Sequence, residues 1–482
     1  MDIKILGGEK EIGGNKVLIE HKDTKILLDF GMSFGQASKY FSEFLQPRKC
    51  ASLTDFYEFK LLPRLRGAYR LDYLKHMERR NETKGIDALF LSHAHADHSQ
   101  YIHFLRNDIP IYCTEATKIL LQTMEETGSN TFSDLITSCE AFTFRENKLG
   151  GVSRVTRKDL DFVKEREFHI MKPNEKVKMG DLEIEMVPVD HSLPGSCAFI
   201  IYSDEGTLIY TGDIRFHGSN QELSRKFVER AKSLKPKWLI SEGTRIDKND
   251  MDSEEKVKND LSKFISLGKG LVFVEHPIRD TDRVKSVYLA TKENKREFVI
   301  GLKEAYLIRA LENKNLAPFK LSDVKILIPK KSWGLITRDD LEAKQKEQDY
   351  DTWEREFIGL TNAITYKELQ ANPSKYVVST NQWELTQLVD LKPKDAIWIK
   401  SSVEPFCEDM ELDEKRKKNW LKHFKMKEYF AHASGHASGP ELKAMIKSIN
   451  PEILIPMHTQ HREMFEWQNL KKRGKKNNME EE

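Results

Sequence analysis

The 482-residue chain is poor in cysteine, carries almost no excess charge and contains no long apolar segment. Its five cysteines form no CxxC pair, which argues against a disulfide framework or a zinc ribbon. Reduced thiols are therefore expected, and with them a cytoplasmic location. No stretch approaches the ~18 apolar residues that a membrane helix needs, and the first residues lack the apolar core of an export signal. Neither a membrane span nor export is expected.

The charge balance also limits how the chain would meet a polyanion. Lysine and arginine number 78 against 76 aspartates and glutamates, which leaves a formal net charge of +2. No global field would attract nucleic acid, so any nucleic-acid site must be a local groove. The length allows two to four domains at the usual ~100 to 200 residues each.

The most informative segment is the run of four potential metal ligands between His93 and His98, which reads HAHADH. An apolar strand is predicted before it, at 86–92, and the start of a helix after it, at 100–106. Imidazole and carboxylate groups suit a divalent ion such as zinc. Four donors on one short loop exceed what a single ion takes comfortably, so the sequence predicts two ions.

Further polar side chains follow later predicted strands. They are His191 after 182–189, Asp213 after 207–210, Glu242 after 238–241 and His458 after 452–457. In α/β proteins, sites gather where strand ends meet their loops, so these residues are expected to converge with the HAHADH loop.

Each of these residues also has a purely structural interpretation. An isolated histidine at a strand end is usually a hydrogen-bonded core residue. Asp213 would serve as a turn former and Glu242 as a helix N-cap. The glycine pairs at 7–8 and 13–14 resemble a phosphate loop, but they precede a strand and lack the Gly-Lys-Ser/Thr ending. Only the combination with the HAHADH loop favours metal binding.

The pattern of predicted elements changes after residue 245. From 246 to 427 helices alternate with short β-rich runs, which predicts a second α/β domain with a parallel sheet. The segment 428–470 brings another strand, a helix and the strand before His458. The tail 471–482 has a basic run and then an acidic run, and it is expected to be disordered.

Two segments have no evident place in this scheme, 46–83 and 145–170. The first is basic, with apolar and aromatic residues at helical spacing. It is read as an inserted helical element with a solvated face, and the alternative is the wall of a groove that contacts a polyanion.

The ordered set of Asp29, the HAHADH loop, His191, Asp213, Glu242, His436 and His458 resembles the motifs of the metallo-β-lactamase superfamily. The last three match the A, B and C motifs of its β-CASP nucleases. The phrases at 432–438 and 455–458 are similar to the RNase J branch in particular. This resemblance implies an α/β (αββα) domain formed by 1–245 and 428–470, with the β-CASP domain at 246–427 inserted into it.

The resemblance also assigns metal ligands. By analogy, His93, His95 and His191 hold one divalent ion, and Asp97, His98 and His458 hold the other. Asp213 bridges the two ions, and Asp29 supports the ligands from behind. Zinc is expected, with manganese as the alternative.

Two ions bridged by Asp213 and a water would supply a hydroxide that attacks phosphorus, leaving a 5′-phosphate and a 3′-hydroxyl. His436, assisted by Glu242, would help to protonate the leaving oxygen. Ser434, Gly435 and Ser438 surround His436 and would contact the substrate phosphate, or would only shape the turn. The segment around Arg279, Asp282 and Arg283 resembles one found in β-CASP domains; a structural salt bridge is expected there, and contact with the substrate is the alternative.

The predicted function is that of an RNase J-like ribonuclease acting on single-stranded RNA, with 5′-to-3′ exonuclease activity favoured over endonuclease activity. The alternatives are a DNA-directed β-CASP nuclease and a small-molecule hydrolase of lactonase or esterase type. The loop continues with Ser99 and Gln100 where RNase J commonly has glycines. Cleavage mode, RNA target, metal identity and the homodimeric state stay open.

Overall fold

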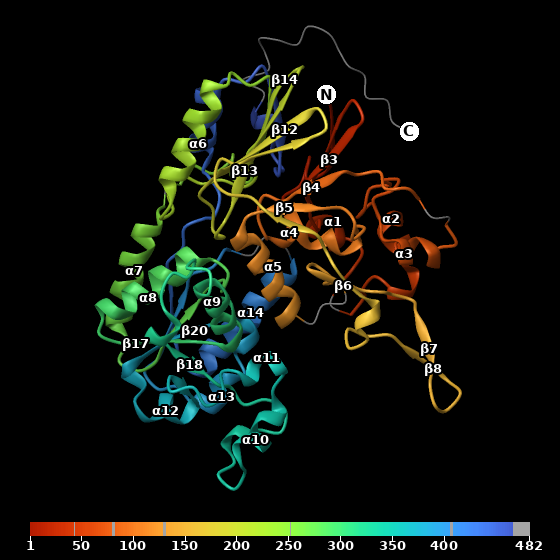
Figure 1. The fold of residues 1–482 in the computed structure, drawn as a ribbon. Helices are drawn as coiled ribbons and strands as arrows, with labels where there is room; N and C mark the ends of the chain where they lie inside the picture. Colours follow the sequence, from red (N-terminus) through yellow and green to blue (C-terminus); the bar gives the residue numbers. More distant parts are fainter. Residues whose placement is uncertain (43, 80–81, 129–131, 251, 405–407, 466–482) are drawn as a thin grey trace.

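The computed structural model describes residues 1–42, 44–79, 82–128, 132–250, 252–404 and 408–465. The tail predicted to be disordered, 471–482, lies outside these residues. Figure 1 shows two facing sheets in the upper part of the molecule and a third sheet, wrapped by helices, at the lower left.

The first sheet is mixed, with strand order β1-β2-β3-β4-β5-β10. It comprises β1 (Asp2–Gly7), β2 (Lys16–His21), β3 (Thr24–Phe30), β4 (Ala88–Phe90), β5 (Ile111–Cys113) and β10 (Phe168–Ile170). The first three strands are antiparallel, and β3, β4 and β5 run parallel. The HAHADH loop therefore leaves the sheet at the end of a central strand.

The second sheet has the order β11-β12-β13-β14-β15-β23. Its strands are β11 (Lys176–Met179), β12 (Leu182–Pro188), β13 (Cys197–Ser203), β14 (Gly206–Tyr210), β15 (Trp238–Glu242) and β23 (Ile453–Met457). The last strand, β23, pairs in parallel with β15, although more than 200 residues separate them in the chain.

Alternating apolar side chains bind the two sheets together. Val17 and Ile19 of β2 point into the core shared with the second sheet, whereas Leu18 points to the outer helical layer. In the same way, Phe199 of β13 points into this shared core, whereas Ile200 points to the outer helical layer of the second sheet. Because side chains alternate along a strand, strands that are apolar on both faces require cover on both faces.

Helices supply that outer cover. The first sheet is covered by α5 (Glu115–Thr127) with the short helices α2 (Thr54–Glu58) and α3 (Leu71–His76), and the second by α6 (Gln221–Ser233) and α15 (Gly439–Ile449). The layers therefore run helix, sheet, sheet, helix, which confirms the predicted αββα fold class.

The third sheet is wholly parallel, in the order β19-β18-β17-β20-β16-β21-β22. Its strands are β16 (Val272–Glu275), β17 (Glu297–Ile300), β18 (Lys325–Leu327), β19 (Ala363–Ile364), β20 (Tyr376–Thr380), β21 (Ile397–Lys400) and β22 (Lys427–Phe430). Its main helices are α7 (Glu254–Leu267), α8 (Thr281–Glu293), α9 (Leu302–Glu312), α12 (Tyr366–Ala371), α13 (Gln387–Leu391) and α14 (Glu408–His423). Cores on both faces match the parallel-sheet domain predicted from the alternating pattern.

The chain passes between the αββα part and the third sheet twice. The predicted division after 245 falls in the loop between β15 and α7. The predicted division at 427/428 falls inside β22, which pairs with β21 as the edge strand of the third sheet. The chain therefore returns to the αββα part after Phe430.

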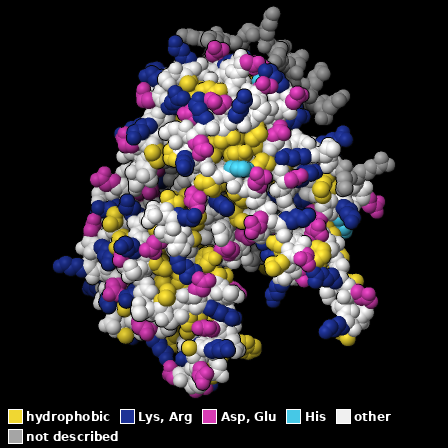
Figure 2. Space-filling view, in the orientation of Figure 1, with side chains coloured by type: hydrophobic (Ala, Val, Ile, Leu, Met, Phe, Trp, Pro, Cys, Tyr) yellow, Lys and Arg dark blue, Asp and Glu magenta, His cyan; other side chains and the backbone are white. Residues whose placement is uncertain are grey.

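The segment 46–83 lies on the helical side of the first sheet, whereas the segment 145–170 ends in β10, an edge strand of that sheet. The segment 46–83 contains α2 and α3, and the segment 145–170 contains most of a hairpin formed by β7 (Phe144–Glu146) and β8 (Val152–Arg154). Figure 1 shows this hairpin projecting away from the body of the molecule, and the same projection stands out at the lower right of Figure 2. Later in the second segment, β9 (Val163–Glu165) forms a short antiparallel pair with β6 (Thr137–Cys139), which precedes the segment. Among the described residues, no helix combines the length and apolarity needed to cross a membrane.

Candidate metal centre

Loops at the ends of β4, β12, β14, β15 and β23 bring the predicted ligands to one place. Ligand atoms of His93, His95, His191 and Asp213 all lie within 4.8 Å of one another, and so do those of Asp97, His98 and His458. A third overlapping group joins Asp213 and His458 to Glu242 and His436. The residues predicted from separate strand ends are thus neighbours in space.

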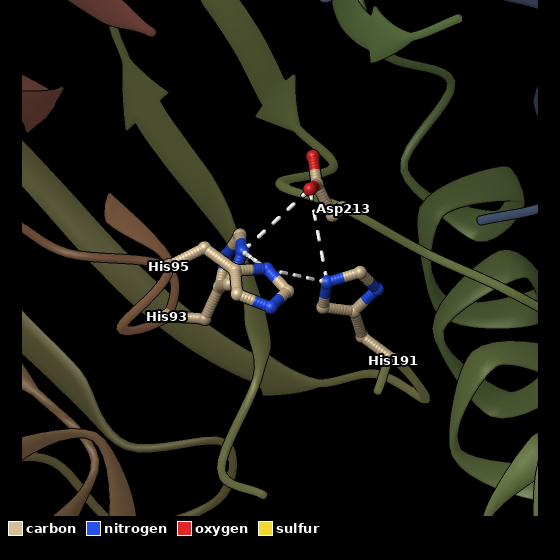
Figure 3. Close-up of side chains that lie close together, drawn as sticks. All are labelled: His93, His95, His191 and Asp213. Carbon is tan, nitrogen blue, oxygen red and sulfur yellow. Dashed lines mark hydrogen bonds and ion pairs between the residues drawn. The ribbon is translucent and has the colours of Figure 1, made fainter. Parts of the chain in front are cut away.

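Figure 3 shows the first group, in which three imidazoles and a carboxylate converge. The Nδ1 atom of His95 lies 3.0 Å from Nε2 of His93 and 3.1 Å from Nε2 of His191. Both Nε2 atoms face the Oδ2 atom of Asp213, at 3.5 Å for His93 and 3.7 Å for His191. Nitrogen atoms at this spacing, all aimed at a common point, suit a divalent cation.

The second group is built around Asp97. Its Oδ2 atom lies 3.0 Å from Nε2 of His458 and 3.9 Å from Nε2 of His98. Because His458 follows β23, this group forms only when the returning chain has joined the second sheet.

Asp213 lies between the two groups. Its Oδ2 atom is 3.3 Å from Nε2 of His98 and 4.0 Å from Nε2 of His458, besides its approaches to the first group. Both carboxylate oxygens are buried, and neither has a hydrogen-bond partner among the described residues. A buried carboxylate without donors is costly unless it meets positive charge, so this orphaned group fits a pair of cations.

The histidines of the first group are held in the form that binds metals. Burial lowers the pKa of His95 to about 4, and it lowers the pKa values of His93 and His191 further below their usual range. Neutral imidazole, with a free lone pair, is the species that coordinates a metal. The backbone oxygen of Gly435 accepts a hydrogen bond from Nδ1 of His191 at 2.5 Å, which leaves Nε2 free to face Asp213.

Asp29 supports the cluster from behind. Its Oδ2 atom accepts hydrogen bonds from Nδ1 of His98 at 2.7 Å, from the Ser92 hydroxyl at 2.7 Å and from the Tyr210 hydroxyl at 2.6 Å. The other oxygen accepts the Ser92 amide at 2.7 Å. A carboxylate on the far nitrogen of a histidine fixes its tautomer and turns Nε2 toward the centre.

Glu242 and His436 form a pair at the edge of the centre. Nδ1 of His436 lies 3.1 Å from Oε2 of Glu242 and 3.8 Å from Oδ2 of Asp213. Burial alone would lower the pKa of His436, but the two carboxylates outweigh it and raise this pKa to about 9. Glu242 also accepts the Ile214 amide at 2.8 Å, so it is not simply a helix cap.

The three residues around His436 that were predicted to contact phosphate make different hydrogen bonds. The Ser434 hydroxyl accepts the His436 amide at 3.1 Å, and Gly435 holds His191. Ser438, by contrast, is fully buried and caps α15, with its hydroxyl donating to Glu441 at 3.0 Å. Of the residues predicted to contact phosphate, Ser438 alone has its side chain committed to a helix cap.

Several supporting residues were not predicted. Asn15 is buried, and its Nδ2 atom lies 2.7 Å from Nε2 of His98. The Thr244 hydroxyl lies 2.6 Å from Nδ1 of His458. Asn15 follows the second glycine pair, which approaches the metal centre closely: a Cβ atom on Gly13 would lie 2.9 Å from the Cβ of Asp97. The glycine loop, which was considered only as a phosphate loop, packs against the HAHADH loop.

The segment around Asp282 and Arg283 is structural, as expected. Arg215, which follows β14, donates to Asp190 at 3.3 Å and to Asp282 at 2.5 Å. Arg283 is fully buried and donates to Glu254 at 2.9 Å and to the Ala433 oxygen at 3.0 Å. These bonds tie the third sheet to the αββα part.

Comparison with known families gives two matches. Residues 62–251 match a model described as a beta-lactamase superfamily domain. Residues 423–479 match a model described as a Zn-dependent metallo-hydrolase RNA specificity domain. The first range holds the HAHADH loop, His191, Asp213 and Glu242, and the second holds His436 and His458.

Curated relatives align over almost the whole chain. Ribonuclease J 2 of Streptococcus pyogenes is 21% identical over 475 residues, covering 96% of this chain and 71% of that protein. Ribonuclease J of Pyrococcus abyssi is 23% identical over 486 residues, covering 97% of this chain and 92% of that protein.

A solved structure supports the fold independently. The crystal structure of a protein of unknown function from Enterococcus faecalis superposes with a TM-score of 0.69 at 22% identity. The match covers 96% of this chain and 95% of the other. The likeness therefore includes the third sheet and the return of the chain to the second.

Proposed function

Because this chain belongs to the metallo-β-lactamase superfamily and, within it, to the β-CASP family of RNase J type, we propose that it is a metal-dependent ribonuclease. It hydrolyses phosphodiester bonds of single-stranded RNA, and it does so as a 5′-to-3′ exonuclease in preference to an endonuclease. The hydrolysis leaves a 5′-phosphate and a 3′-hydroxyl.

The observation that carries this proposal is the position of His436 and His458. Both come from the returning chain, and both join a cluster formed by residues 93–242. A small-molecule hydrolase would need neither the inserted third sheet nor a return segment that supplies these two histidines. The match of the return segment to an RNA specificity domain favours RNA over DNA.

The donor set accommodates two divalent ions, of which zinc is favoured and manganese is the alternative. His93, His95 and His191 would hold one ion, Asp97, His98 and His458 the other, and Asp213 both. When bound, the ions would neutralise phosphate charge and acidify water, so that no protein nucleophile is needed.

The protein groups supply the remaining steps. Asp29 and Thr244 orient His98 and His458, and Gly435 orients His191. Glu242 holds Nδ1 of His436, so the Nε2 atom of His436 is left to donate a proton to the leaving 3′ oxygen. Ser434, whose hydroxyl accepts a hydrogen bond from the His436 amide, and Gly435 would contact the substrate phosphate beside that histidine.

A cleavage assay tests the proposal. Metal-analysed protein is incubated with single-stranded RNA labelled at the 5′ end, carrying either a monophosphate or a triphosphate, and with DNA of matched sequence. Release of labelled mononucleotide from the monophosphate RNA is expected. Internal fragments independent of the 5′ end would replace the exonuclease proposal with an endonuclease. Cleavage of DNA alone, or of neither polymer, would reject a ribonuclease.

A further inference from the structure

The segments 46–83 and 145–170 enclose a cavity of about 630 Å³. Lys49 and Cys50 line it from the first segment, and Arg154 and Arg157 from the second, with Phe142 and Phe144 between them. No residue of the candidate metal centre lines it. We call this space the insertion cavity, because both segments that the proposed function leaves unused contribute to its lining, together with His103 and residues between 133 and 144.

Ring stacking and hydrogen bonds connect the segments that form the walls of the insertion cavity. The His76 ring stacks on Phe142 with centroids 3.8 Å apart, and its Nε2 atom lies 2.9 Å from the backbone oxygen of Cys50. At the opposite wall, Asp134 accepts hydrogen bonds from Arg70 and Arg157, each at 2.6 Å. The cavity is therefore formed before any ligand arrives, as is usual for small-molecule sites.

Two cations that line the cavity have no directly bonded anionic partner among the described residues. The side chains of Lys49 and Arg154 form no hydrogen bond or ion pair with any residue that the structure describes, whereas Asp134 is already neutralised by two guanidinium groups. Burial, and then the charge of Arg154, lower the pKa of Lys49. Both side chains are exposed, and because the two cations repel each other, an anion between them would be favoured.

The same cavity offers aromatic surface. The side chain of Phe144 is 57% exposed, although it is large and apolar. Phe142 has a φ of 62°, a left-handed conformation that is uncommon for a bulky residue and is kept where surrounding contacts or function require it. Exposed aromatic rings beside cations form the combination that binds nucleotides through base stacking and phosphate contacts.

We propose that the insertion cavity binds a single nucleotide unit, with its phosphate between Lys49 and Arg154 and its base against Phe144. The volume is in the range of sites for ligands of this size. The unit is either a free nucleoside monophosphate or one residue of an RNA strand. The proposal does not depend on catalysis, because the cavity and the metal centre share no residue.

Two cysteines make this site directly observable. Cys50 and Cys139 both line the insertion cavity, and Cys50 is exposed. Metal-loaded full-length protein is alkylated with and without adenosine 5′-monophosphate, and each cysteine is followed by peptide mass spectrometry. The nucleotide should slow alkylation of Cys50 and Cys139. The Lys49→Glu/Arg154→Glu variant should need about tenfold or more nucleotide for the same protection, since two charge-assisted contacts are lost.

The matched control is Lys148→Glu/Lys158→Glu, which makes the same charge change on the exposed hairpin segment outside the cavity lining. It should keep wild-type protection. A Lys49→Ala/Arg154→Ala variant repeats the test without introduced carboxylates. A phosphorothioate hexaribonucleotide that protects at lower concentration than the mononucleotide would assign the site to an RNA strand, and the reverse order would assign it to free nucleotide.

Three results would overturn the proposal: no protection by either ligand, equal protection by adenosine without phosphate, or protection that survives both cavity variants. Because the readout is alkylation at named cysteines, these results do not depend on whether RNA is cleaved. Loss of RNA cleavage with intact protection would instead count against the proposed function alone.

Discussion

Asp97 and His436 bear most directly on the chemistry at the residue scale. Asp97 belongs to the second ligand group, and His436 is the candidate proton donor. Asp97→Ala or His436→Ala should reduce RNA cleavage by about 10²-fold or more while the fold is retained. Single-turnover rates and thermal unfolding are measured on both variants after metal analysis.

Asp108→Ala, which removes a surface carboxylate paired with Arg106, is the control and should cleave normally. Full activity in both site variants would refute the assignment.

Asp29 should act through His98 rather than through the substrate. Its φ of 55° is left-handed, a conformation that asparagine also tolerates, so Asp29→Asn preserves the backbone. The amide nitrogen of asparagine is a donor. In the place of Oδ2 it could not accept the hydrogen bonds that His98, Ser92 and Tyr210 donate to Asp29. Metal affinity should fall about 10- to 100-fold.

Chelator competition measures that affinity. Asp87→Asn is the matched control, because among the described residues Asp87 accepts a hydrogen bond only from the Lys25 amide, at 2.7 Å. A variant at Asp29 that bound metal as tightly as the control would show that the Asp29 contacts play no part in holding the ions.

The candidate metal ligands are also the part of the site that could be predicted from the sequence. Histidine and carboxylate at a strand end are rare enough to attract notice, so His191, Asp213 and His458 were identified. Asn15 and Thr244 are ordinary polar residues whose importance comes only from the atoms they approach, at 2.7 Å and 2.6 Å. No spacing in the sequence distinguishes them.

At the scale of elements, the glycine loop after β1 and the turn after β3 clamp the HAHADH loop. A Cβ atom on Gly31 would lie 1.7 Å from the backbone oxygen of Asp97. Because backbone must move to make room, Gly31→Ala should displace Asp97, destabilise the protein by about 1–3 kcal/mol and lower cleavage. Gly35→Ala, whose nearest contact would be 3.8 Å away, should behave as wild type. Urea unfolding and cleavage rates check both variants; equal behaviour would mean that the turn is not held against Asp97.

Helices and strands were predicted correctly where the pattern of apolar residues is strong. The strands β12 and β14 lie within a residue or two of the ranges predicted for them, because apolar runs between turn residues leave few alternatives. The helix predicted from Gln100 is only a 3₁₀ segment, Gln100–Phe104. The charged stretch 339–356, whose composition favours a single exposed helix, instead forms two short helices, α10 (Ala343–Lys346) and α11 (Thr352–Arg355). Between them Tyr350 is buried and donates to the Pro329 oxygen at 2.5 Å, a tertiary contact that no local pattern reveals.

At the scale of the whole molecule, helix α9, which packs against the third sheet, contains a buried carboxyl group that should couple stability to pH. Burial raises the pKa of Glu304 from 4.5 to about 8, although the Ser379 hydroxyl donates to it at 2.5 Å. Between these two pH values the folded protein keeps a proton that the unfolded chain releases. Stability should therefore fall as pH rises through this window, by up to about 1.4 kcal/mol per pH unit for one proton.

Glu304→Gln should remove that contribution, because the amide cannot titrate. Urea unfolding at several pH values between 5 and 8 compares the variant with wild type, and Glu146→Gln, exposed on β7, is the control. The wild type and the control should lose stability more steeply with pH than Glu304→Gln does. Parallel profiles for all three would show that Glu304 is ionised in the folded protein.

The assembly of the metal centre depends on the whole chain, since ligands arrive from the HAHADH loop, from the second sheet and from the strand that returns after the third. The most direct test is to strip the protein with a chelator and add back zinc or manganese while bound metal and RNA cleavage are measured together. Cleavage should be absent without metal and should reach its full rate only as about two ions bind per chain. Cleavage of RNA at the full rate by metal-free protein would contradict the account.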